Sequence, residues 1–205
     1  MFPAHVETDR LHLRRFDEHA DLWEAYDIFD SNQVAGEAYR YIPGKPHATP
    51  KETFDFITDA REDWKDAERA VYAVYPKAGE DGEGELIGNT MLNPQWEKRT
   101  ARLGIRLRKP YWGNGYSGER AAALISIAFD RLDLDVVGAG HVPGNEQSKR
   151  AIEKYVERFG GGRDGILRNW LPHDGEVYDL HVYTITREQY ETNRPADLGV
   201  VIHDD

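Results

Sequence analysis

A glycine-rich junction between an expected strand and an expected helix is the most distinctive part of the sequence. Residues 103–107 follow a strand-like pattern, and three glycines occur within residues 113–118. The clearest helical pattern of the chain, 117–132, starts in the same loop and has apolar residues along one face. Backbone N–H groups in such a turn, together with those of the first helical turn, form a concave donor site for a phosphate group. The alternative is a tight connection without a ligand.

The spacing of the loop glycines argues against two common phosphate-binding motifs. The segment Trp112-Gly113-Asn114-Gly115-Tyr116-Ser117-Gly118 is neither Gly-x-x-x-x-Gly-Lys-Ser/Thr nor Gly-x-Gly-x-x-Gly. Nucleoside triphosphates and NAD are therefore poorer candidates as ligands of this loop.

The order of hydrophobic patterns predicts the α/β class, with a mixed sheet covered by helices. Helix 50–64 has Thr49 as its expected N-cap and Pro50 at its first position, and Gly88 is expected to form a bulge. The expected elements are strand 10–16, helices 19–29 and 50–64, strands 70–75, 86–92 and 101–107, helix 117–132, strand 136–141, a helix from about Asn145, and strands 165–170 and 177–186.

The length of 205 residues predicts a single domain, expected over residues 1–190. The polar residues 191–205 are expected to form a loosely attached C-terminal extension. No apolar run is long enough to span a bilayer, and the N-terminus lacks the pattern of a secretory signal, so we expect no membrane and a cytoplasmic location.

Composition excludes several kinds of chemistry. The chain has no cysteine, which removes disulfides, thiolate nucleophiles and Cys-ligated metals. Its eight histidines show no paired metal-ligand spacing along the sequence, so we expect no metal site. The net charge of −11 makes this an acidic protein and argues against nucleic-acid binding.

Motifs on both sides of the loop give the chain a family resemblance. The segments concerned are Thr8-Asp9-Arg10-Leu11-x-Leu13-Arg14, Gly84-Glu85-Leu86-Ile87-Gly88, Tyr111-Trp112-Gly113-Asn114-Gly115-Tyr116-Ser117, Asn145-Glu146-Gln147-Ser148 with Lys154-Tyr155, Gly165-Ile166-Leu167-Arg168-Asn169-Trp170, and Val182-Tyr183-Thr184. With these segments the chain resembles the GNAT superfamily of N-acetyltransferases, most closely its RimJ/RimL-like branch, whose loops often read Tyr-Trp-Gly-x-Gly-Tyr-Ala. The resemblance covers about residues 8–190 with every segment in family order.

The resemblance implies a GNAT fold: a mostly antiparallel mixed sheet of six to seven strands, with a splayed central strand pair and about four flanking helices. It implies acetyl-CoA as the acyl donor. Backbone groups of Ile105 and Leu107 would run beside pantetheine, and the thioester would enter between strands 101–107 and 136–141. The coenzyme A pyrophosphate would lie on the amides of Trp112, Gly113, Asn114, Gly115, Tyr116, Ser117 and Gly118.

Asn145 and Ser148, at the start of the next expected helix, each have two possible interpretations. Asn145 is a typical N-cap residue with Ser148 three positions later. The resemblance implies instead that both face the coenzyme, with Ser148 as the catalytic residue that hydrogen-bonds the departing thiolate. Arg108 and Lys109 either add positive charge for the phosphates or are ordinary solvated residues.

The general base cannot be assigned from the resemblance. Arg102 stands where the branch often has Glu, and a guanidinium does not serve as a base. Glu37, Glu176, His141 and His173 remain open, each also interpretable as a surface or turn residue. The aromatic residues Tyr39, Tyr41, Trp96 and Trp170 are expected either in the substrate wall or in the core.

The leading functional hypothesis is transfer of acetyl from acetyl-CoA to a primary amine, by direct attack in a ternary complex. The acceptor would be a protein N-terminus or a small-molecule amine, and the acidic surface would weakly attract a cationic one. The alternative is a non-catalytic acyl-CoA sensor, favoured by Arg102 in place of Glu. A longer acyl donor and a homodimer are further possibilities that the sequence leaves open.

Overall fold

The computed structural model describes residues 1–30, 39, 41, 44–173 and 175–203. Within these residues, the helices are α1 (Phe16–His19), α2 (Leu22–Phe29), α4 (Pro50–Lys65), α5 (Tyr116–Ser126), α6 (Glu146–Arg158) and α7 (Arg187–Asn193). The strands are β1 (His5–Glu7), β2 (Leu11–Arg15), β3 (Ala70–Pro76), β4 (Gly88–Gln95), β5 (Thr100–Leu107), β6 (Val136–His141), β7 (Gly162–His173), β8 (Glu176–Thr186) and β9 (Val201–His203).

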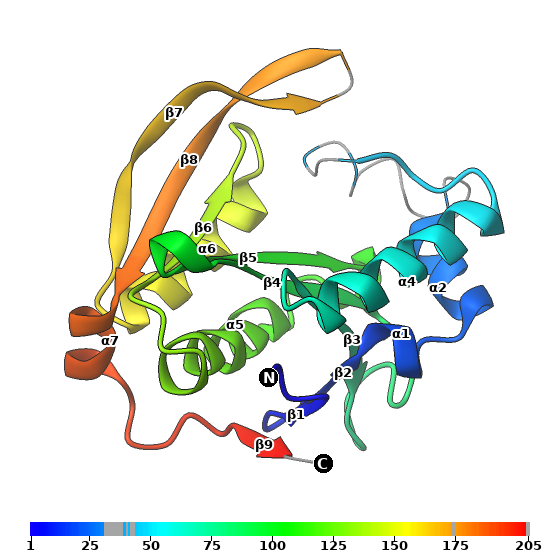
Figure 1. Ribbon diagram of the computed structural model, residues 1–205, viewed down its shortest axis with the longest axis horizontal. Helices are drawn as coiled ribbons and strands as arrows, with labels where there is room; N and C mark the ends of the chain where they lie inside the picture. Colours follow the sequence, from blue (N-terminus) through cyan, green and yellow to red (C-terminus); the bar gives the residue numbers. More distant parts are fainter. Residues whose placement is uncertain (31–38, 40, 42–43, 174, 204–205) are drawn as a thin grey trace.

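All nine strands of the described residues form one sheet, in the order β7-β8-β6-β5-β4-β3-β2-β1-β9 (Figure 1). Every neighbouring pair is antiparallel except β5 and β6, which are parallel. The expected α/β architecture is confirmed. The sheet is wider than the six to seven strands predicted, because β1 and β9 extend one edge beyond the strand expected at residues 10–16.

The two faces of the sheet carry separate apolar clusters. On β3, Tyr72 and Val74 belong to the cluster that includes α5, whereas Val71 and Ala73 pack with α1, α2 and α4. This division follows from the period of two along a strand, which sends successive side chains to opposite faces. The helices therefore lie in two layers, one on each face.

The helix expected over residues 19–29 begins later and is preceded by a separate turn, α1. Asp21 caps α2, because its carboxylate accepts hydrogen bonds from the N–H groups of Trp23 and Glu24. Thr49 occupies the N-cap position of α4 as expected, but its side chain makes no capping bond. The helix expected over 117–132 is α5 followed by a π-helical turn, Ile127–Arg131.

Gly88 does not form the expected bulge, since it pairs with Val74 in the regular register of β3 and β4. Glycine is required at this position because the backbone of Arg106 lies very close. A Cβ on residue 88 would be 2.1 Å from the carbonyl oxygen of Arg106. The last two strands are longer than expected and form a hairpin that extends from the body of the molecule (Figure 1).

The residues after 190 are not loosely attached throughout. Residues 201–203 form β9, which pairs with β1 from His5↔His203 to Glu7↔Val201, so both ends of the chain meet at one edge of the sheet (Figure 1). The sequence did not predict this strand, because three residues are too few to establish a period. No helix among the described residues is long and apolar enough to cross a bilayer.

Candidate active site

The central strands β5 and β6 separate along their length. They pair only from Thr100↔Val136 to Arg102↔Gly138. Beyond this point β5 continues beside β4 as far as Leu107, and β6 continues beside β8 as far as His141. Since each strand keeps its outer partner, the two diverge, and the splayed pair that the resemblance implied is present.

A cavity of about 1860 Å³ occupies this opening and continues to the start of α5. Its lining includes residues of β5, β6, α5 and α6 together with the glycine loop. All the site residues predicted from the sequence contribute to this one cavity: Ile105, Leu107, Trp112, Gly113, Asn114, Gly115, Tyr116, Ser117, Gly118, Asn145 and Ser148.

The glycine loop exposes a series of free backbone donors. Gly113 and Gly115 have φ of 88° and 84°, a conformation that favours glycine. The N–H groups of Gly118 and Glu119 bind the carbonyl of Gly115, but among the described residues no group accepts a hydrogen bond from the N–H groups of residues 113–117. A Cβ at Gly113 or Gly118 would meet no atom within 4 Å. The loop therefore fits a phosphate group, which would bind these amides.

The loop is held from the opposite end of the chain. Arg10 donates from Nη1 to the carbonyl of Asn114 at 2.9 Å, and its Nε donates to Glu119 at 2.8 Å. The backbone N–H of Arg10 and the hydroxyl of Thr8 donate to the other carboxylate oxygen of Glu119. These contacts give a physical role to the Thr8-Asp9-Arg10 segment, for which the sequence predicted none.

The side chains of Trp112 and Arg108, beside the loop glycines, have partners outside the loop. The indole N–H of Trp112 donates to the carbonyl of Leu107 at 2.7 Å, so this carbonyl already has a partner. Arg108 lies 3.4 Å from Glu85 and does not line the cavity, whereas Lys109 does line it. The donors that the loop offers are therefore mainly backbone groups.

Arg120 is a cationic residue of the cavity that sequence reasoning missed. Its side chain is 2% exposed, and its Nε and Nη1 have no hydrogen-bond partner among the described residues. Burial lowers the pKa of this guanidinium, while the neighbouring Tyr155 has a raised pKa for the same reason. A buried cation with unsatisfied donors is unfavourable unless an anion joins it. The only sequence signal was its position one turn beyond the loop glycines.

Asn145 and Ser148 lie together at the start of α6. The side-chain oxygen of Asn145 accepts from the N–H of Ser148 at 3.0 Å, so the capping interpretation is confirmed. Both residues also line the cavity, and among the described residues no group hydrogen-bonds to the hydroxyl of Ser148. This hydroxyl is thus free to interact with a ligand.

His141 is the one described base candidate that lines the cavity, whereas His173 and Glu176 do not. It is only 5% exposed, so it is neither a surface nor a turn residue. Glu37 lies outside the described residues. Among the aromatic candidates, Tyr41 and Trp170 line the cavity. Tyr39 packs in the core, and the indole of Trp96 donates to the carbonyl of Ala67.

The ring of His141 is held by polar contacts on both nitrogens. Its Nδ1 lies 3.0 Å from the carbonyl of Val142, and its Nε2 lies 3.2 Å from the hydroxyl of Tyr183. The hydroxyl of Tyr183 is also 3.2 Å from Glu153. These contacts fix the orientation of the ring at the edge of the cavity.

Arg102 and Arg106 of β5 lie on the face of the sheet opposite to that of Ile105 and Leu107. Arg102 lies opposite Asn93, and Arg106 lies opposite Asn89 with its guanidinium 4.3 Å from the ring of Tyr39. Both line the cavity, and no carboxylate of the described residues pairs with either. Burial lowers the pKa of both guanidinium groups. This part of the cavity is consequently cationic, although the protein as a whole carries a net charge of −11.

Comparisons with known proteins agree with this geometry. A family model described as an acetyltransferase (GNAT) domain matches residues 10–155. YoaA of Bacillus subtilis strain 168, named an uncharacterized N-acetyltransferase, is 26% identical over 188 residues, which cover 91% of this chain and 98% of the relative.

Solved structures share the fold. A GNAT family acetyltransferase from Bacillus anthracis has a TM-score of 0.72 at 24% identity, with 90% of this chain and 99% of that chain covered. Mycobacterium smegmatis RimJ, solved in complex with CoA-disulfide, has a TM-score of 0.76 at 17% identity, with 97% and 92% covered. The family match extends over most of the chain, and the protein therefore belongs to the GNAT family, as an acyl-CoA-dependent N-acetyltransferase that uses acetyl-CoA.

Proposed function

We propose that the acceptor is a primary amine, which attacks acetyl-CoA directly while both are bound in one ternary complex. The observation that supports this proposal most is the continuity of the cavity, which runs from the free amides of residues 113–117 to His141 through the opening between β5 and β6. The amine nitrogen forms a bond to the thioester carbonyl carbon, the C–S bond breaks, and coenzyme A leaves as the thiolate. The absence of cysteine supports direct transfer over a cysteine-linked intermediate.

We propose that acetyl-CoA, the acyl donor, lies along the glycine loop, β5 and Ser148, which offer free hydrogen-bonding groups. Its diphosphate binds the free amides of residues 113–117, with Arg120 as the nearby buried cation. Pantetheine follows β5 past Ile105, where the strand has no partner on the β6 side. The free hydroxyl of Ser148 donates to the departing thiolate, which it stabilises by hydrogen bonding.

His141 is proposed to take the proton that the attacking amine loses, through an intervening water. Its ring is oriented by the carbonyl of Val142 and the hydroxyl of Tyr183, and Tyr183 in turn contacts Glu153. His141→Gln is expected to lower kcat by about 10²- to 10⁴-fold, with the affinity for acetyl-CoA unchanged. The neighbouring His181 does not line the cavity, so His181→Gln is the matched control. Equal kcat values for the two variants would exclude His141 from this role.

The positive charges of Arg102 and Arg106 in the cavity limit which amines can bind there as acceptors. Arg102 and Arg106 disfavour a polycationic amine and favour a primary amine that carries a carboxylate or phosphate group close by. This local charge opposes the expectation drawn from the net charge, because charged groups within a few ångströms dominate over distant surface charges in salt. Small amino compounds and acidic protein N-termini both satisfy the requirement.

The function is tested by measuring coenzyme A release with purified protein, acetyl-CoA and a panel of amines. The panel pairs each anionic amine with its neutral ester or amide, so that the effect of the anion is isolated. Release that requires an amine, and is faster with the anionic member of each pair, is the expected result. Tight acetyl-CoA binding without release for any amine would contradict the proposal.

A further inference from the structure

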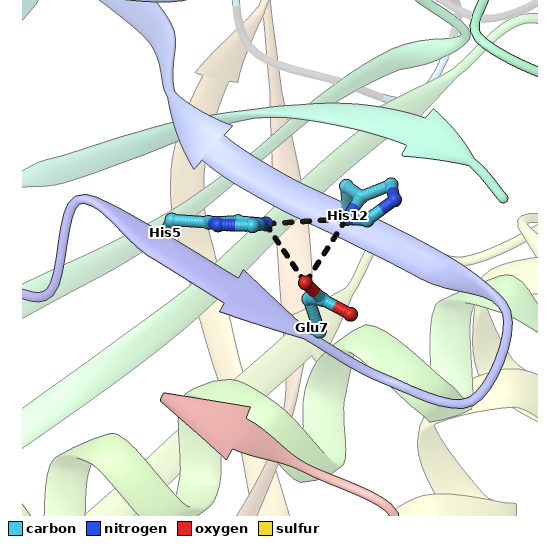
Figure 2. Close-up of side chains that lie close together, drawn as sticks. All are labelled: His5, Glu7 and His12. Atoms are coloured by element: carbon cyan, nitrogen blue, oxygen red, sulfur yellow. Dashed lines mark hydrogen bonds and ion pairs between the residues drawn. The ribbon is translucent and has the colours of Figure 1, made fainter. Parts of the chain in front are cut away.

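A second group of functional side chains lies outside the cavity, on the edge strands β1 and β2. His5 and Glu7 are two residues apart on β1 and share one face of the sheet, and Glu7 is directly opposite His12 on β2. Figure 2 shows the three side chains converging, with one ligand atom from each within 4.8 Å of the others. None of the three lines the cavity, so this cluster is distinct from the active site.

The distances between these atoms resemble those of a metal centre. His5 Nε2 lies 3.1 Å from His12 Nδ1, and Glu7 Oε1 lies 3.7 Å from the first nitrogen and 3.8 Å from the second. Zn²⁺ binds His and carboxylate ligands at about 2.0–2.2 Å in tetrahedral geometry, which separates neighbouring ligand atoms by about 3.3–3.6 Å. The observed spacings differ from this range by only a few tenths of an ångström.

The surrounding contacts direct one oxygen of Glu7 toward the imidazoles. Lys77 donates to Glu7 Oε2 at 2.7 Å, and the other oxygen, Oε1, faces His5 and His12. A third imidazole, that of His203 on β9, has Nε2 at 3.1 Å from the same Oε1 and stacks on His5 with ring centroids 4.4 Å apart. Nitrogens of three imidazoles thus lie within 3.8 Å of this one carboxylate oxygen.

The two strands that carry the imidazoles are held firmly by the core. On the opposite face of the sheet, Val6 and Leu13 pair with each other, are fully buried and hold the two strands in position.

We propose that His5, Glu7 and His12 form a binding site for a divalent transition metal ion of the Zn²⁺ type, which links β1 to β2 at the edge of the sheet. Two imidazoles and one carboxylate favour Zn²⁺ and its neighbours over Mg²⁺ or Ca²⁺, which prefer oxygen ligands. The spacing along the sequence led to the opposite expectation, since only the antiparallel register places His12 across from Glu7. The hairpin turn that follows Glu7 carries Thr8 and Arg10, so the ion would stabilise the same segment that holds the glycine loop.

The test uses the full chain without an affinity tag, freed of metal by a chelator. Isothermal titration with Zn²⁺ is expected to give one ion per chain, and Co²⁺ is expected to give the visible absorption of a four-coordinate site. Zinc at about one hundred times Kd should raise Tm by about 5 to 10 °C, and Mg²⁺ should not.

The ligand assignment is tested by His5→Gln, Glu7→Gln and His12→Gln, each of which removes one ligand and keeps a side chain of similar size. Each is expected to weaken zinc binding at least tenfold. Loss of a direct ligand should cost no less affinity than loss of a group that only supports a ligand, which costs about 10- to 100-fold. His19→Gln, an exposed histidine on α1, is the control and should bind like the wild type. The proposal is overturned if the wild-type chain binds no stoichiometric zinc, or if the three folded variants bind it as tightly as the control.

Discussion

Arg10 and Glu119, 109 positions apart in the sequence, form a close ion pair, with Nε and Nη2 of the arginine 2.8 and 2.7 Å from the same carboxylate oxygen. The pair joins the turn between β1 and β2 to the first turns of α5. Because Arg10 also donates to the carbonyl of Asn114, it positions the glycine loop as well as the helix. The conformation of the candidate phosphate site therefore depends on residues at the N-terminal end of the chain.

Glu119→Gln is expected to destabilise the protein and weaken acetyl-CoA binding. Both carboxylate oxygens accept hydrogen bonds from Thr8 or Arg10, so the amide nitrogen of Gln would face a donor. The expected loss is about 1–3 kcal/mol of unfolding free energy, measured by urea denaturation. Glu191→Gln removes an exposed carboxylate 3.8 Å from Arg187 and should change stability by less than about 0.5 kcal/mol. Similar losses in both variants would show that the Glu119 contacts have no special weight.

Gly118→Leu is expected to abolish acetyl-CoA binding while the fold is retained. Gly118 has an ordinary helical conformation, and a Cβ there meets no atom within 4 Å, so the new side chain enters open space beside the loop. Leucine also has a higher helix propensity than glycine. Isothermal titration measures the affinity, and Gly165→Leu, which places a side chain in open space on β7, is the control. Unchanged affinity in Gly118→Leu would place the diphosphate elsewhere.

Arg120→Met is expected to separate stability from coenzyme binding. Removing a buried guanidinium with two unsatisfied nitrogens should leave the stability of the ligand-free protein unchanged or increase it. The affinity for acetyl-CoA should fall about tenfold or more, which is about 1.4 kcal/mol or more. Thermal denaturation and titration measure the two quantities, with Arg168→Met, at an exposed arginine of β7 outside the cavity, as the control. A strong loss of stability with normal affinity would mean that Arg120 serves the core alone.

His47 is expected to make stability depend on pH. Its ring packs 4.6 Å from that of Phe29 and its Nδ1 lies 2.8 Å from the hydroxyl of Thr53. Burial lowers its pKa below the ordinary 6.5, with Arg106 as a further cause. The unfolded chain then takes up this proton at a higher pH than the folded chain does, so stability decreases as the pH falls below about 6.5, until the folded pKa is passed.

The slope attributable to His47 is at most about 1.4 kcal/mol per pH unit. Urea denaturation between pH 7.5 and 5, in the presence of a chelator, measures it. His47→Gln keeps a hydrogen-bonding side chain but cannot titrate, so its stability should vary less over this range. The same slope in both proteins would assign the pH dependence to other histidines.

Local pattern was enough to predict most of the elements and the order in which they occur. The strand before Gly113, the glycines of positive φ and the helix after them are all properties of a short segment, and the class of fold follows from the sequence of such segments. The boundaries were less accurate where a single side chain competes with the periodic pattern. Asp21 is an example, since its capping bonds separate α1 from α2.

The relationships between distant segments were decided by the tertiary structure. Periodicity tells which side of a strand is buried, but it does not tell which strands are neighbours or in which register they pair. The pairing of β9 with β1, the contact of Arg10 with Glu119 and the grouping of His5, Glu7 and His12 all depend on that register. The sequence alone thus determined the glycine loop and its place between strand and helix, whereas the burial of Arg120 and the polar contacts of His141 arise only when separate elements pack together.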